Sequence, residues 1–145
     1  GHAAVLNVLI GARADVNKAA NDGTTPSFMS AHEGHAAVLN VLIGARADVN
    51  KANNDGTTPS FMSAQKGHAA ALNVLIGARA DVNKAKNTGA TPSSVSAQKG
   101  HAAVLNVSAA KGHSAVLNVL IGVLIGARAD VNKAANDGAT PIFTS

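Results

Sequence analysis

The chain has 145 residues and a formal net charge of +4, and it contains no Cys, Trp or Tyr. The absence of cysteine excludes disulfides and thiolate metal sites, and it favours an intracellular location in a reducing compartment. The excess of basic residues does not predict a nucleic-acid partner, because basic residues never occur in runs and no aromatic side chain alternates with them to stack on a base.

The sequence repeats itself with a period of 33 residues. Residues 1–33 and 34–66 differ at three positions, and residues 67–99 differ from 34–66 at six positions. A fixed period in this range indicates a solenoid, in which one small unit is stacked many times. We therefore interpret the chain as a single domain with three regular repeats and an irregular final unit, 100–145.

Each repeat is predicted to contain two helices and a polar finger. Thr25-Pro26 marks the start of a first helix, because the Thr hydroxyl can accept a backbone N–H and Pro fits the first helical position. Gly34 is expected to end this helix, and His35 opens a second helix with adjacent apolar rows. The following segment, 46–56, is rich in Asn and Asp-Gly turn formers and is predicted to project as a finger.

This unit resembles the ankyrin repeat. The family motif joins Asp-Gly, Thr-Pro and Gly-His to an apolar helix and a final Ala-Asp-Val-Asn, and this chain has Asp22-Gly23, Thr25-Pro26, Gly34-His35 and Ala47-Asp48-Val49-Asn50. The match runs through all four units in order. The resemblance implies an all-α repeat solenoid of stacked antiparallel helix pairs with projecting β-turn fingers, and a concave face that binds other proteins.

The first helix departs from the family pattern in two ways. The core Leu after Thr-Pro is replaced by Ser in three repeats, and the motif His is replaced by Phe or Ser, so the family's ladder of hydrogen-bonded His cannot form. Phe is expected to fill part of the volume that Leu would occupy. The residues concerned are Ser27, Ser60, Ser93, Phe28, Phe61 and Ser94.

The end of the second helix departs as well, because Arg13, Arg46 and Arg79 stand where the family has Gly. Either each Arg adopts a positive φ at a cost of about 1 kcal/mol, or the helix ends at the Gly two residues earlier. We expect partial fraying there. A weakened core and ends without polar caps predict that neighbouring chains or further repeats keep the array ordered, as in an excerpt of a longer array.

The regular phase ends after Gly100. Residues 101–111 and 113–126 are predicted to form two consecutive helices joined by a turn at Gly112, or one long helix if Gly112 stays helical. The finger at 128–140 should then be misaligned with the earlier fingers. The longest apolar stretch has 12 residues, which is shorter than the about 20 that a membrane-spanning helix needs, so no direct membrane insertion is expected.

No motif in the chain predicts catalysis, a cofactor or a metal site, so we predict a non-enzymatic protein. Five histidines follow Gly at helix starts. They are expected to cap these helices in a row spaced ~10 Å apart, which is too wide for shared zinc ligation. They are His2, His35, His68, His101 and His113.

By resemblance, partner contacts lie on the finger tips and the inner face of the first helices. These positions are Asn21, Asp22, Thr24, Met29, Asn54, Asp55, Thr57, Met62, Asn87, Thr88, Ala90 and Val95. The predicted function is a non-catalytic scaffold that binds protein partners through this face. Two alternatives are a structural subunit or linker in a large assembly, such as one with membrane proteins, and the non-catalytic appendage of an enzyme.

Overall fold

The computed structural model describes residues 2–110, which form seven α-helices and no strand. The helices are α1 (His2–Gly11), α2 (Pro26–His32), α3 (Ala36–Gly44), α4 (Pro59–Lys66), α5 (Ala69–Gly77), α6 (Pro92–Lys99) and α7 (Ala102–Ala110). The expected helix at 101–111 is therefore observed as α7. The expected turn at Gly112, the helix at 113–126 and the finger at 128–140 lie outside the described residues.

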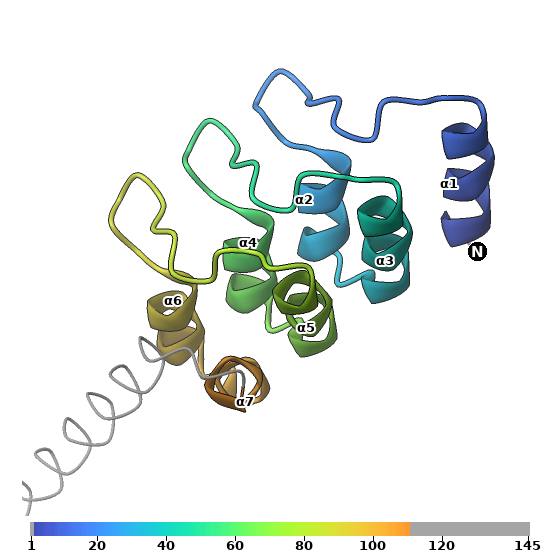
Figure 1. Ribbon diagram of the computed structural model, residues 1–145. Coiled ribbons are helices and arrows are strands. Elements are labelled where there is room, and N and C mark those ends of the chain that lie inside the picture. The colour runs from blue at the N-terminus through green and yellow to red at the C-terminus, as the bar shows by residue number, and fades with distance from the viewer. Residues whose placement is uncertain (1, 111–145) are drawn as a thin grey trace, which may run out of the picture.

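The helices form two parallel rows along a solenoid (Figure 1). One row contains α2, α4 and α6, and the other contains α1, α3, α5 and α7; neighbours within each row are in contact. Each of α2, α4 and α6 also packs against the helix that follows it in the chain. The loops between repeats project to one side as fingers. The all-α repeat solenoid expected from the 33-residue period is confirmed.

The first helices begin at Thr-Pro, as predicted. The hydroxyl of Thr25 accepts a hydrogen bond from Phe28 N at 3.2 Å, and Thr58 accepts one from Phe61 N at the same distance. Thr91 and Ser94 cap each other reciprocally at the start of α6. These bonds satisfy backbone donors that the first turn of a helix leaves without intrahelical partners, so the start of each first helix is encoded locally.

The second helices end without fraying, which corrects the expectation from the sequence. Their last helical residue is Gly, but Arg13, Arg46 and Arg79 take φ of 65°, 64° and 62°. Arg46 N donates to Ile43 O at 2.9 Å, and Ala47 N donates to Leu42 O at 2.9 Å. This pair of bonds is a Schellman motif, so the bonds to the last carbonyls hold each Arg in a conformation that normally favours Gly.

The core is thin and consists mainly of aliphatic side chains from the second helices. Leu39, Leu42 and Leu75 are fully buried, and Phe61 is the largest fully buried side chain. Serines fill the positions at which the first helices would otherwise contribute Leu. The hydroxyls of Ser27 and Ser60 are buried with no hydrogen-bond partner, so these positions weaken the core.

Candidate functional site

Each described finger ends in a tight turn that two backbone hydrogen bonds close. In the first finger Ala20 N donates to Thr24 O at 2.8 Å, and Gly23 N donates to Ala20 O at 2.9 Å. The fingers at 53–57 and 86–90 repeat this pair. Gly23 has a φ of 82°, and a Cβ there would lie 2.9 Å from Asn54 N of the next finger. Glycine is therefore needed for the turn and for the close approach of the fingers.

A ladder of asparagines joins the finger tips. Asn54 N donates to Asp22 O at 3.0 Å, and Asn54 Nδ2 donates to Asn21 O at 3.2 Å. Asn87 makes the same two bonds to Asp55 O and Asn54 O, at 3.0 and 3.2 Å. The amide donors of Asn54 and Asn87 therefore hold neighbouring fingers together, and these tips are fixed relative to one another.

A second ladder joins the bases of the fingers. Asn17 Oδ1 accepts a hydrogen bond from Asp48 N, and Asn50 Oδ1 accepts one from Asp81 N, both at 2.7 Å. From the sequence, such Asn residues were expected only to form turns. Their recurrence every 33 residues was visible, but the recurrence alone does not show that they bond from one repeat to the next.

Most of the predicted contact residues are exposed, but two are not. Thr57 is 5% exposed and Val95 is 6% exposed, so neither presents its side chain to a partner, and we remove both from the proposed surface. Val95 belongs to the same buried apolar cluster as Phe61 of the neighbouring first helix. Thr24, Met62 and Ala90 are half-buried, and the exposed positions are Asn21, Asp22, Met29, Asn54, Asp55, Asn87 and Thr88.

The charge of the exposed residues changes from repeat to repeat along the stack, a feature that was not expected to belong to the site. The last residue before the turn that follows each first helix is exposed, and it is Glu33, Lys66 and Lys99 in successive repeats. At the finger tips Asp22 and Asp55 are followed by Thr88 in the third repeat. We call the exposed finger tips and the exposed side chains of α2, α4 and α6, with Glu33, the finger surface; it is acidic at its N-terminal end and basic at its C-terminal end.

The carboxylate of Asp22 is held by its own finger. Asp22 Oδ1 accepts hydrogen bonds from Thr24 N at 2.9 Å and from the Thr24 hydroxyl at 2.7 Å. These bonds favour the charged form, the backbone bond most strongly, and they lower the pKa of Asp22 below its ordinary value. Asp22 thus stabilises the tip that it also presents to solvent.

This lowered pKa predicts a pH dependence of stability. The stabilisation by Asp22 should be complete above the pKa of Asp in the unfolded chain and should be lost as the pH falls through the lower folded-state pKa. Thermal melts of the wild type and Asp22→Asn should therefore differ at neutral pH and converge in acid. Asp55→Asn is the control, because within the described part of the chain the Asp55 carboxylate accepts no hydrogen bond. A gap between wild type and Asp22→Asn that stays constant down to strongly acid pH would contradict the assignment.

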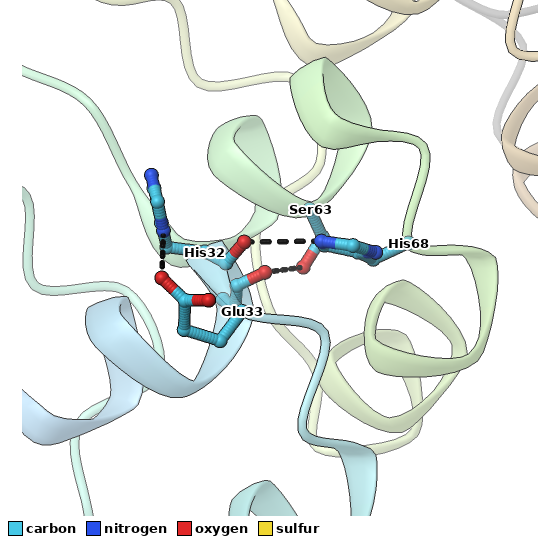
Figure 2. A network of polar contacts seen from close by, with 5 residues as sticks. His32, Glu33, Ser63 and His68 are labelled. Atoms are coloured by element: carbon cyan, nitrogen blue, oxygen red, sulfur yellow. Dashed lines mark hydrogen bonds and ion pairs between the residues drawn. The ribbon is translucent and has the colours of Figure 1, made fainter.

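His68 and His101, at the starts of second helices, link neighbouring repeats through their side chains. His35 and His68 are the N-cap residues of α3 and α5, but neither makes a side-chain capping bond. His68 Nε2 instead donates to His32 O at 3.0 Å (Figure 2), and His101 Nε2 donates to Gln65 O at 3.0 Å. The expectation of capping is wrong for His68, because the carbonyls at the end of the preceding first helix lack intrahelical donors and accept the imidazole N–H.

Two further contacts support this link between repeats. The hydroxyl of Ser63 donates to Ala31 O at 3.4 Å, beside the bond from His68 to His32 O (Figure 2). A Cβ at Gly34 would lie 2.7 Å from His68 Nδ1, so the absence of a side chain at residue 34 lets the imidazole lie over the backbone.

His32 Nδ1 lies 2.6 Å from a Glu33 carboxylate oxygen, and this hydrogen bond lowers the pKa of Glu33.

Residues 2–110 show no arrangement that points to metal chemistry or to membrane insertion. Within this part of the chain, no three His, Asp or Glu side chains come together as a metal site. None of the helices described there is both long and apolar enough to span a membrane.

A family model described as ankyrin repeats in three copies matches residues 1–86 and 31–107. These overlapping matches cover all of the regular repeats and most of α7. No curated protein matches the chain.

Proposed function

The chain belongs to the ankyrin-repeat family, and from this premise we propose that it is a non-catalytic scaffold that binds a protein partner along its finger surface. Ankyrin repeats are generally protein–protein interaction modules and are typically non-catalytic. The observation that carries the proposal is the asparagine ladder, because it holds successive exposed finger tips at fixed positions.

A surface that is ordered before binding loses less entropy when a partner arrives. Two ladders of hydrogen bonds connect the described fingers, one at the tips and one at the bases. The backbone at the tips is therefore constrained, while Asp55, Asn21 and Thr88 keep exposed side chains. This arrangement supports binding by the fingers over binding by the exposed side of the second helices.

The chemistry of the finger surface favours an extended partner. The remaining contact residues include no Trp, Tyr or Arg, the residue types in which binding energy usually concentrates. The energy must then be spread over several repeats. A partner segment that is basic near Asp22 and Glu33 and acidic near Lys66 and Lys99 would complement the charge of this surface.

The test uses a peptide selected from a random library against the complete chain. Asp55→Lys should weaken binding of this peptide by about tenfold, because it reverses a charge at the centre of the finger surface without removing a finger hydrogen bond. Asn73→Lys on the exposed side of α5 is the matched control and should leave the affinity unchanged, as should Asn40→Lys on α3.

The companion variant Asp22→Lys also breaks the bonds to Thr24, so its affinity is read only together with its melting temperature. Equal effects of Asp55→Lys and Asn73→Lys, or no effect of either, would reject the finger surface as the binding site. Calorimetric titration of each variant at one low salt concentration provides the affinities. Low salt is needed because high salt screens the exposed charges of the finger surface.

A second candidate function is a structural subunit or linker within a large assembly. The observation that favours it is the weak core, in which the hydroxyls of Ser27 and Ser60 are buried without a hydrogen-bond partner. An array with such a core gains stability from neighbouring chains. This candidate does not involve the finger surface.

A further inference from the structure

An arginine lies just after each described second helix that leads into a finger. Arg13, Arg46 and Arg79 occupy the same position in successive repeats, and all three are exposed. Their φ values lie between 62° and 65°, a left-handed conformation that Gly adopts freely and other residues rarely adopt. An unfavourable conformation that recurs in every repeat, at a position that suits Gly, points to a function for the side chain.

The guanidinium groups of these arginines take no part in the described fold. Within residues 2–110 they form no hydrogen bond and no ion pair, and the bonds that close the helix end use the backbone of Arg46. The carboxylate of Asp48, the nearest acidic residue in the sequence, accepts a hydrogen bond from Asn50 N at 2.8 Å. The same bond recurs in the other two finger bases. The aspartates thus hold the finger bases, and the charge of each arginine remains available to a partner.

The three arginines form a regularly spaced row, which we call the arginine row. Helix α3 contacts both α1 and α5, and the fingers leave from the same ends of these helices (Figure 1). Helices that pack side by side have axes about 8 to 10 Å apart, so the arginines recur at about this distance. Asn17 Nδ2 donates to Arg46 O at 3.4 Å, and Asn17 Oδ1 accepts from Asp48 N at 2.7 Å. These bonds between repeats hold the backbone of the row in place before a partner arrives.

The charges beside the arginine row are the same in every described repeat. Each arginine begins the sequence Arg-Ala-Asp-Val-Asn-Lys, at 13–18, 46–51 and 79–84. This sequence has two basic residues and one acidic residue, so its net charge is +1. The finger tips do change between repeats, for example from Asp55 to Thr88. The arginine row therefore suits a partner whose negative charges recur at a fixed spacing.

We propose that the arginine row binds an acidic protein segment in the polyproline II conformation, with a carboxylate at every third residue. Such a segment rises about 3.1 Å per residue with three residues per turn, so every third side chain returns to one face after about 9 Å. This distance matches the spacing of the arginines, whereas a β-strand returns to one face after about 7 Å. Each guanidinium can pair with one carboxylate through two parallel hydrogen bonds, a geometry that Arg provides and Lys does not.

Two features favour a protein segment over nucleic acid or an anionic membrane. Proteins that bind single strands stack bases on aromatic side chains, but Phe28 and Phe61, the aromatic residues of the described part of the chain, are buried. A nucleic-acid backbone or an anionic membrane presents closely spaced negative charges, which would also face Asp48 and its equivalents. A segment with separated carboxylates can meet the arginines without contacting the aspartates.

The arginine row is separate from the finger surface, so this inference goes beyond the proposed function. The test is an NMR titration of the isotope-labelled complete chain at low salt with a peptide that repeats Glu-Pro-Pro over about 12 residues. Amide signals around the arginine row should shift and saturate with a Kd of about 1 mM or lower, and added salt should weaken the binding. A peptide of the same composition with its Glu residues grouped at one end should bind about fivefold more weakly, because its carboxylates cannot reach successive arginines.

Matched double variants locate the binding. Arg46→Gln with Arg79→Gln removes two charges from the arginine row and keeps side chains of similar length, so the affinity for the Glu-Pro-Pro peptide should fall about tenfold. Lys66→Gln with Lys99→Gln removes the same charge from the finger surface and should leave this affinity nearly unchanged. All four residues are exposed, so both double variants should fold, and circular dichroism checks that they do.

Four results would overturn the proposal. If no peptide binds, the arginines act only on the carbonyl ends of their own helices. Equal weakening by the two double variants would show that net charge alone attracts the peptide. Equal affinities of the regular and the grouped peptide would show that the spacing of the row is not recognised. Tighter binding of a single-stranded oligonucleotide or of anionic lipid vesicles, lost in the arginine double variant, would assign the row to nucleic acid or to a membrane.

Discussion

Replacement of Ser27, Ser60 and Ser93 by Leu is expected to raise the melting temperature by roughly 15 to 25 °C, from about 2 kcal/mol of added burial at each position. The three side chains are 1%, 0% and 5% exposed, so an added aliphatic group would be removed from water. The change also removes the hydroxyls of Ser27 and Ser60, which are buried without a hydrogen-bond partner. Thermal melts of the triple variant, followed by circular dichroism, measure the effect.

The matched series Ser→Ala at the same positions separates the two contributions. Ala removes the hydroxyl without filling space, so it should produce the smaller part of the gain. If Leu lowered the melting temperature while Ala raised it, these sites would already be filled and the added volume would strain the core. A cooperative melt of the wild type above about 80 °C would also contradict the interpretation of a weakened core, since ordinary domains melt well below that.

Replacement of Arg13, Arg46 and Arg79 by Gly is expected to stabilise the chain by about 3 kcal/mol in total. Each Arg has a φ between 62° and 65°, a left-handed conformation that costs an L-residue about 1 kcal/mol and costs Gly almost nothing. No salt bridge of these Arg side chains exists within residues 2–110, so no ion pair is lost there. Urea unfolding of the triple variant measures the gain.

Replacement of the same three residues by Ala distinguishes conformation from charge. Ala keeps the Cβ that makes a positive φ unfavourable but removes the guanidinium, so Arg→Ala should give little of the gain seen with Gly. If Ala and Gly stabilise equally, repulsion between the cations is responsible. If Gly has no effect, the ends of the second helices are not strained, and the positive φ of these Arg residues is not a cost.

The repeat architecture and most helix boundaries followed from the sequence. The 33-residue period predicted the solenoid, and Thr25-Pro26 predicted the start of α2, because a hydroxyl and a ring of fixed φ act on their own backbone. Gly34 predicted the turn after α2 for a similar reason, and it has a φ of 74°. The burial of Ser27 at a position that favours Leu could also be predicted, since position within the repeat determines which face a residue takes.

The candidate site was predicted less completely. The finger tips and their exposed residues were expected from the resemblance, and most of these residues are exposed. Thr57 and Val95 are buried by neighbouring residues. The sequence pattern of a single repeat does not indicate that residues of other repeats bury them. The change of charge from Glu33 to Lys66 and Lys99 was present in the sequence, but it became part of a surface only when the first helices were seen side by side.

The sequence by itself determined the unit: two helices, a turn and a finger, repeated at a fixed spacing. Only the tertiary structure decided which contacts each unit makes with the neighbouring unit. In the folded stack, His68 donates a hydrogen bond to the preceding repeat instead of capping its own helix. Asn54 donates one to the preceding finger. The physical reason is that a local pattern specifies which donors and acceptors a segment carries, whereas the distance to the adjacent segment decides which of them form hydrogen bonds.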